Sequence, residues 1–181
     1  MDATTTPLMP WLIQKLSAAH PTVVFEKSDH FAWSPSRRTI YYDPSPSLEN
    51  DAPFLLLHEL SHALLEHHTY RRDSELVAME SAAWERTVQY IADSHKWLAS
   101  APAKIPSLTM SDAVVQDHLD TYREWLHARS TCPVCSATGY QTKQYRYACP
   151  ACSHQWRVNE ARVCALRRYS ISSSHKNTPV L

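Results

Sequence analysis

The sequence predicts an α+β protein, with helices and a small sheet in its first part and a small cysteine-based module near its C-terminus. Apolar residues recur at helical spacing in four segments, at 10–20, 53–68, 73–99 and 111–127. β-Branched and aromatic residues fill two short runs, 22–26 and 38–42, which are typical of strands. Two C-x-x-C pairs follow these elements. A chain of 181 residues is long enough for one well-filled core and such a module.

Turn and capping residues separate these segments. Pro21 ends the first helix, and the sequence at 34–36 indicates a turn. Two prolines after the strand at 38–42 prevent it from continuing, and Asp51 or Asn50 can cap the next helix. Because this strand comes directly before that helix, we expect it to line a cleft and to hold an extended peptide at its free edge.

The second predicted helix carries the motif His58-Glu59-Leu60-Ser61-His62 within an apolar run. Helical residues four positions apart lie one above the other, so the two histidines can reach one ion. Zinc accepts two imidazole nitrogens and one carboxylate and leaves a position for water, whose proton Glu59 is placed to take. The alternative is a pair of surface histidines on an ordinary amphipathic helix. His67 and His68 follow and are expected to contact the last carbonyls of the helix.

The helix at 73–99 is expected to supply the third ligand, from among Glu80, Glu85 and His95. The residues three and four positions from Glu80 are all apolar, so its carboxylate points into the packed face. These neighbours are Leu76, Val77, Ala83 and Trp84. Burial of an unpaired carboxylate is costly, and coordination to a metal removes that cost. Glu80 is therefore the preferred ligand. The helical neighbours of Glu85 are partly polar, which suits a solvated side chain, and His95 suits a surface position.

Four of the five cysteines form two pairs that are typical of a zinc ribbon. They are Cys132, Cys135, Cys149 and Cys152, with thirteen residues between the pairs. Each C-x-x-C can wrap a metal ion with two thiolates, and a core this small needs the metal to fold. The segment 140–147 is strand-forming, and Gly139, the only glycine, is expected in a turn. A redox dithiol is the alternative, although two matched pairs favour a metal.

Charge is divided unevenly along the chain. Residues 1–120 carry 9 Lys and Arg against 16 Asp and Glu, whereas residues 121–181 carry 9 against 2. Such asymmetry often accompanies contact with nucleic acid or acidic proteins, although the two halves could simply attract each other. Basic and aromatic residues alternate around the ribbon, so a single-stranded nucleic acid is a candidate ligand. They are Lys143, Arg146, Arg157, Arg162, Arg167 and Arg168, with Tyr140, Tyr145, Tyr147, Trp156 and Tyr169.

The strand at 38–42, the motif at 58–62 and the segment 75–84 together resemble the ImmA/IrrE family of metallopeptidases. The resemblance covers residues 1–100 and implies a compact zincin-like fold. It also implies that His58, His62 and Glu80 hold zinc and that Glu59 is the general base. Many members act on DNA-binding repressors, so the resemblance implies a protein substrate such as a transcriptional repressor.

Some positions depart from the patterns of known families. Ser61 stands where the ImmA/IrrE family usually has Gly, and Ala82 stands where many members carry a second acidic residue. In the ribbon, Ser136 and Ser153 stand where Gly often follows the second cysteine. An HExxH motif with a C-terminal zinc ribbon also resembles the SprT-like proteases, which act on DNA-bound proteins but use a third His as ligand.

These observations predict a zincin-like metallopeptidase domain over 1–130, a zinc ribbon with a basic extension over 131–169 and a disordered tail over 170–181. The expected activity is that of a zinc metalloendopeptidase with one catalytic and one structural Zn²⁺. A non-catalytic regulator that binds nucleic acid through its ribbon is the competing hypothesis. No apolar run approaches the ~18 residues of a membrane span, and the first residues lack signal-peptide features, so a cytoplasmic location without membrane contact is expected.

Overall fold

The computed structural model describes residues 8–45, 51–93, 110–160 and 165–171. Within these residues the protein is α+β, with four helices and two small sheets, which confirms the predicted class. None of the described helices is long and apolar enough to cross a membrane. By compactness, the chain divides into a first unit of 1–69 and 78–116 and a second unit of 70–77 and 117–181. The predicted domain limits place residues 70–77 and 117–130 in the first domain instead of the second unit, and they stay a prediction.

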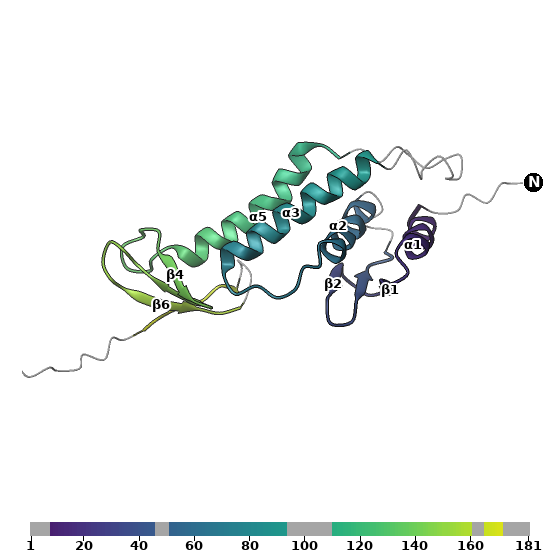
Figure 1. Ribbon diagram of the computed structural model, residues 1–181. Helices are drawn as coiled ribbons and strands as arrows, with labels where there is room; N and C mark the ends of the chain where they lie inside the picture. The colour runs from purple at the N-terminus through teal and green to yellow at the C-terminus, as the bar shows by residue number, and fades with distance from the viewer. Residues whose placement is uncertain (1–7, 46–50, 94–109, 161–164, 172–181) are drawn as a thin grey trace, which may run out of the picture. The chain divides into compact units, whose positions relative to one another are not determined.

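The first unit contains a three-stranded sheet and the helices that carry the HExxH motif and Glu80. Its elements are α1 (Leu8–Ala19), β1 (Val24–Lys27), β2 (Ala32–Ser34), β3 (Thr39–Tyr42), α2 (Ala52–Leu64) and most of α3 (Asp73–Ala92). α1 packs against α2, and both helices contact the sheet (Figure 1). Leucines from the two helices and Ile40 from β3 form the centre of a buried core. The motif helix is therefore anchored by its apolar face.

β3 is the central strand of this sheet, and its position corrects one expectation. β3 pairs in parallel with β1 and antiparallel with β2, so the strand order is β1-β3-β2. β2 directly precedes the turn expected at 34–36, and the sequence does not indicate this strand because three residues are too few to give a periodic signal. Since both edges of β3 are hydrogen-bonded, it has no free edge for a peptide. Among the described residues, the outer strands are β1 and β2.

The ends of α2 and α3 also differ from the sequence expectation. α2 ends at Leu64 rather than near His67 and His68, because the chain turns at Glu66, whose backbone is left-handed with φ 53°. α3 is described as far as Ala92. The expected continuation to residue 99, including the candidate ligand His95, lies outside the described residues.

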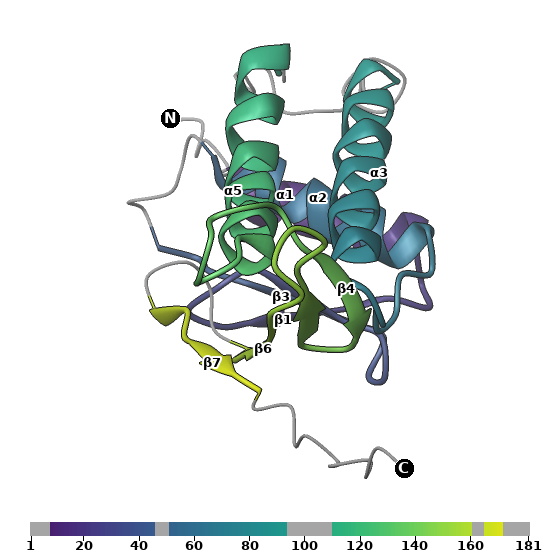
Figure 2. The ribbon, with the colours of Figure 1, turned by 90° about the vertical axis from the view of Figure 1, so that its left-hand side faces the viewer.

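The second unit is built around a four-stranded antiparallel sheet, and we call the described residues of 131–171, which contain this sheet and the four cysteines, the ribbon. Its elements are α5 (Asp112–Ser130) from residue 117 onward, β4 (Tyr140–Lys143), β5 (Arg146–Ala148), β6 (Gln155–Val158) and β7 (Arg168–Ser170). The strands are adjacent in chain order, β4-β5-β6-β7 (Figure 2). The sequence indicates only the first hairpin. β7 includes Ser170, the first residue of the expected tail, and residues 172–181 of that tail and Arg162 of the basic series lie outside the described residues.

Gly139 is required by close packing rather than by a turn. Its backbone is not left-handed, so its conformation alone does not demand glycine. A Cβ atom at this position would lie 2.3 Å from Cη2 of Trp156 and 2.7 Å from the Ala148 carbonyl oxygen. Trp156 is fully buried and stacks on Tyr147, with ring centroids 5.6 Å apart. The small core of the ribbon therefore leaves no space for a side chain here.

A buried ion pair joins α5, the first turn of α3 and the ribbon within the second unit. Arg129 Nε donates a hydrogen bond to Asp73 Oδ2 at 2.6 Å, and both side chains are fully buried. The Tyr147 hydroxyl donates to the same oxygen, and burial followed by this bond raises the pKa of Tyr147. Arg129 also donates to the Asn159 carbonyl at 2.7 Å. A buried charge is tolerated when it is paired and hydrogen-bonded, as it is here.

Candidate metal centres

Two helices of the first unit bring His58, His62 and Glu80 together. α2 supplies the two histidines one turn apart, and α3 supplies the carboxylate. Nε2 of His58 lies 3.1 Å from Nε2 of His62 and 3.1 Å from Oε2 of Glu80. Nε2 of His62 lies 3.5 Å from the same carboxylate oxygen. All three residues are buried, and their side-chain donor atoms face one common point.

The three donor atoms fit the ligand positions of one metal ion. Tetrahedral zinc with bonds of 2.0–2.1 Å separates its ligand atoms by about 3.3 Å, and the observed separations lie on either side of this value. Two imidazole nitrogens and one carboxylate oxygen also form a donor set that catalytic zinc sites use. Glu85 is exposed on α3 and is not part of this group. The structure thus places the preferred Glu80 beside the histidines.

The charge of Glu80 is stabilised within this group. Burial would by itself raise the pKa of the Glu80 carboxyl group. Hydrogen bonds with His58 and then His62 outweigh burial and lower this pKa to about 2. The carboxylate is therefore ionised at neutral pH, in the form that binds a cation.

Trp84 orients the ring of His58. The two rings are stacked, with centroids 4.1 Å apart and planes 26° from parallel. Trp84 follows Glu80 by one helical turn on α3, so one face of α3 provides both the carboxylate and the ring that packs on the first histidine. The sequence places Trp84 on the apolar stripe of this helix, but the spacing does not show which side chain it would contact.

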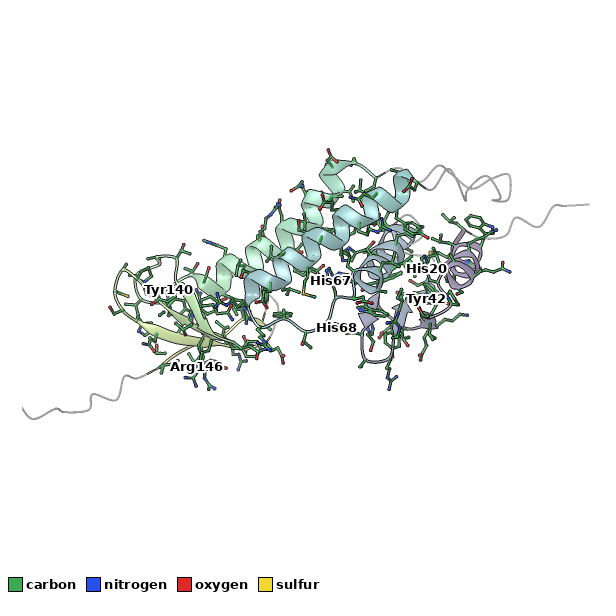
Figure 3. All side chains as sticks on the ribbon, in the orientation of Figure 1. His20, Tyr42, His67, His68, Tyr140 and Arg146 are labelled. Atoms are coloured by element: carbon green, nitrogen blue, oxygen red, sulfur yellow. The ribbon has the colours of Figure 1, made fainter. Side chains whose placement is uncertain are left out.

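His67 contacts the far side of His62, which corrects the expectation that it contacts only helix carbonyls. Its backbone N–H does donate to the His62 carbonyl at 3.0 Å, but its ring Nδ1 lies 2.9 Å from His62 Nδ1. The Trp33 indole donates to the His67 carbonyl at 3.0 Å and holds this segment. Burial, followed by the nearby His62, lowers the pKa of His67, which favours a neutral ring. His67 and the exposed His68 follow α2 (Figure 3).

Ser61, at a position where the ImmA/IrrE family usually has Gly, forms a polar contact between α2 and α3. Its hydroxyl donates to the Leu57 carbonyl at 2.8 Å and lies 2.9 Å from Oγ1 of Thr87. Oγ1 of Thr87 also lies 2.8 Å from the Ala83 carbonyl oxygen, so its single proton can be donated either to that oxygen or to the Ser61 hydroxyl, and both hydroxyl-bearing residues are buried. Thr87 therefore provides a polar partner for the extra hydroxyl, and the two helices still pack closely.

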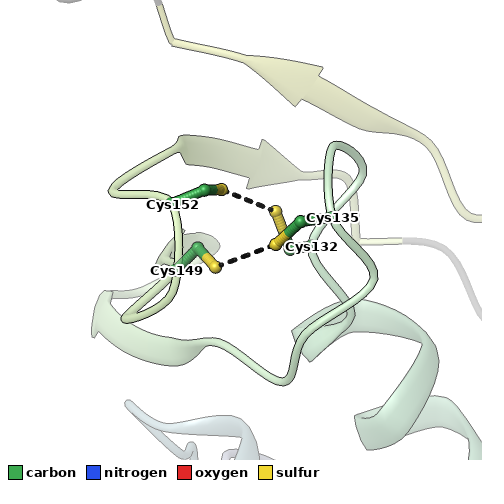
Figure 4. A group of neighbouring side chains, drawn as sticks. All are labelled: Cys132, Cys135, Cys149 and Cys152. Carbon is green, nitrogen blue, oxygen red and sulfur yellow. Dashed lines mark hydrogen bonds between the residues drawn. The ribbon is translucent and has the colours of Figure 1, made fainter.

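Four cysteines of the second unit form another candidate centre (Figure 4). Sγ of Cys132 lies 3.7 Å from Sγ of Cys152, and Sγ of Cys135 lies 3.5 Å from Sγ of Cys149. All four sulfur atoms lie within 4.8 Å of one another. Zinc–sulfur bonds of 2.3 Å place tetrahedral ligands about 3.8 Å apart, so this group also fits one ion. A disulfide would need sulfur atoms about 2.0 Å apart.

The two C-x-x-C turns share one backbone conformation. The Ser136 N–H donates to the Cys132 carbonyl, and the Ser153 N–H donates to the Cys149 carbonyl, both at 3.0 Å. Ser136 and Ser153 are left-handed, with φ 60° and 58°. Glycine adopts this conformation without strain, which explains why it is common after the second cysteine. Here serine takes the same conformation in both turns.

Comparisons of the chain with protein-family models, with curated proteins and with solved structures found no match. The two groups of candidate metal ligands and their surroundings are therefore the features that indicate a function.

Proposed function

We propose that the protein is a zinc metallopeptidase with a zincin-like catalytic domain similar to that of the ImmA/IrrE family. The main support is the spacing of 3.1, 3.1 and 3.5 Å among three buried donor atoms, two from the HExxH motif and one from the next helix. Three protein ligands leave a fourth position open, as in catalytic zinc sites, whereas four cysteines fill a structural site. The proposal therefore assigns a catalytic Zn²⁺ to the first unit and a structural Zn²⁺ to the second.

In this proposal, Glu59 acts first as the general base and then as the general acid. A zinc ion held by His58, His62 and Glu80 would supply Lewis acidity, which polarises a carbonyl group and lowers the pKa of water. Glu59 is half-buried on α2, next to His58 and three residues before His62, so it neighbours the metal-binding side chains. Its carboxylate accepts a proton from the attacking water and then donates it to the leaving amine.

The surrounding side chains keep the two histidine rings in place for this chemistry. Trp84 packs on the ring of His58, and His67 hydrogen-bonds the far nitrogen of His62. If His62 binds metal through Nε2, its Nδ1 carries a proton and donates it to the neutral His67 ring. Both Nε2 atoms then stay directed at the same point.

The third donor favours this peptidase class over the SprT-like proteases, because Glu80 provides a carboxylate where those proteases use a histidine. A protein substrate follows from both resemblances. The ImmA/IrrE resemblance favours a DNA-binding repressor as the substrate, whereas the SprT-like resemblance favours a DNA-bound protein. Under the competing hypothesis of a non-catalytic regulator, a metal ion is needed only in the ribbon.

Substitution of Glu59 by Gln tests the proposal. We expect peptide cleavage to fall by about 100-fold or more, because a general base contributes about 10²–10⁴-fold. Both metal ions should remain bound, since Glu59 is not a ligand. Cleavage can be followed with a mixed peptide library and mass spectrometry of new termini, and metal content by elemental analysis. Glu85→Gln, which alters an exposed carboxylate on α3, is the matched control.

Two results would contradict the proposal. Full activity of the Glu59→Gln variant would exclude the assigned general base. A single metal ion per folded chain, lost on Cys149→Ser and unaffected by His62→Gln, would exclude a metal centre in the first unit and support the regulator.

A further inference from the structure

One face of the β4–β7 sheet is exposed. Residues directly opposite each other in neighbouring strands share a face, and successive residues of a strand alternate between faces. By this rule Tyr147, Trp156 and Val158 share the face that is buried in the ribbon core. The opposite side carries six exposed side chains, and we call it the exposed sheet face. They are Tyr140, Lys143, Arg146, Gln155, Arg157 and Tyr169.

Three of these side chains place like charges directly opposite one another. Lys143 lies opposite Arg146, and Arg146 lies opposite Arg157, so three strands contribute a row of positive charges. Like charges in such pairs destabilise a sheet. The exposed sheet face contains no acidic residue. Among the described residues of the ribbon the acidic side chain is that of Glu160, and it accepts a hydrogen bond from the Tyr145 hydroxyl at 2.6 Å. An anionic ligand would relieve the repulsion in this row.

Two exposed tyrosines lie on the same face as the row. Tyr169 is directly opposite Arg157 at one end of the row, whereas Tyr140 lies in the neighbouring row, opposite Ala148. Tyr140 on β4 is 58% exposed and Tyr169 on β7 is 40% exposed, so their rings are available to a ligand. The Arg157 guanidinium lies over one face of the Tyr169 ring, 4.9 Å from its centroid, which leaves the other ring face for a ligand. β4 and β7 are three strand spacings apart, about 14 Å, which is wide enough for a short stretch of extended ligand. Tyr140 and Arg146 are labelled in Figure 3.

We propose that the exposed sheet face binds single-stranded nucleic acid. In this arrangement Lys143, Arg146 and Arg157 neutralise phosphates, and unpaired bases stack on Tyr140 and Tyr169. A duplex keeps the faces of its bases inside the helix, so it cannot use the tyrosine rings. This inference is independent of the proposed peptidase activity, because it uses no residue of the first unit.

Salt dependence of binding tests the phosphate contacts. The full-length, zinc-loaded protein is titrated into a fluorescein-labelled oligothymidylate of about twelve nucleotides, and anisotropy is measured between 50 and 200 mM salt. Three phosphate contacts predict a slope of log K against log salt of about −2, at about 0.7 per contact. Substitution of Lys143, Arg146 or Arg157 by Ala should each make the slope shallower by about 0.7.

Tyrosine substitutions test the stacking. Tyr140→Leu and Tyr169→Leu should each weaken binding of the single strand by about fivefold or more, with the salt slope unchanged. Lys27→Ala is the matched control, because it removes an exposed positive charge at the end of β1 in the first unit and should leave affinity and slope unchanged. Zinc content and circular dichroism report whether each variant retains the folded ribbon.

Three outcomes would overturn the inference. The absence of salt-dependent binding to any strand would exclude a nucleic-acid ligand. Equal affinity for a duplex of the same length, unaffected by the tyrosine substitutions, would indicate phosphate contacts alone. Competition by polyglutamate as effective as that by unlabelled oligothymidylate would indicate an acidic peptide partner instead. Glu59→Gln should retain binding, so failure of this inference and failure of the peptidase proposal are distinguishable.

Discussion

The two candidate metal centres differ in what holds their donor atoms in place. His58, His62 and Glu80 project from two helices, and α2 is anchored by leucines in the core of the first unit. The four cysteines lie in or next to two turns, each of which contains a left-handed serine. Among the described residues, the core cluster of this module has five buried members, and Cys132 and Cys149 are two of them. Helix geometry and burial can therefore hold the donor atoms of the first centre in place without an ion, whereas we expect the second centre to depend on a bound ion for much of its stability.

The two centres should differ most in how far their units unfold when one metal ligand is substituted. Cys149→Ser should unfold the ribbon, because structural zinc contributes about 10–16 kcal/mol to folding of such modules. His62→Gln should release the metal of the first unit but leave that unit folded. Hydrogen exchange of β4–β7 and of α2, combined with metal analysis, measures both effects. Equal unfolding of the two units by these substitutions would contradict the greater dependence of the second centre on its ion.

Asp73→Ala tests whether the second unit also depends on its buried ion pair. The substitution leaves the Arg129 guanidinium buried without its carboxylate, which should cost about 3–5 kcal/mol in the free energy of unfolding of this unit. Urea denaturation measures the change, and Asp112→Ala, at an exposed position of α5, is the control. α3 also carries Glu80 seven residues later, so retained metal in the first unit would show that the centres are independent.

Gly139→Ala tests how tightly the core of the second unit is packed. The added methyl group would collide with Trp156 and the Ala148 carbonyl, so we expect a loss of about 1–3 kcal/mol or more in stability. Ser136→Gly should have the opposite sign, with a gain of about 1 kcal/mol, because it relieves a left-handed serine. Thermal denaturation of the second unit measures both. A neutral Gly139→Ala variant would contradict the tight packing.

His67→Ala should have the smallest effect on the first centre. Loss of its hydrogen bond to His62 should weaken metal binding about tenfold, because residues that hydrogen-bond a ligand typically contribute 10–100-fold. Competition with a chromophoric chelator and the visible spectrum of the cobalt form report affinity and ligand geometry. His67→Gln keeps a hydrogen-bond acceptor and should restore part of the affinity. His68→Ala is the control, and an equal loss there would exclude the assigned contact.

Much of both centres is predictable from local spacing. Two histidines four residues apart in a helix face the same side, and two cysteines three residues apart can share an ion. Glu80 is also predictable, because its helical neighbours are apolar and a carboxylate among them needs a partner. These inferences depend only on regular geometry and on the cost of burying charge, and both act over a few residues.

Contacts between distant segments are not predictable in this way. The pairing of β3 with β2 leaves β3 without a free edge, although the sequence before the turn at 34–36 does not indicate a third strand. Likewise, the charged row formed by Lys143, Arg146 and Arg157 depends on strand register, because the alternation along each strand does not show which neighbours lie opposite.

The α+β class, the two groups of candidate metal ligands and the preference for Glu80 thus follow from the amino-acid sequence alone. The contacts of His67 with His62 and of Thr87 with Ser61, and the exposed basic face of the ribbon sheet, become evident only in the folded chain. Local patterns specify the face on which a residue lies. Its partner depends on how separate helices and strands come together.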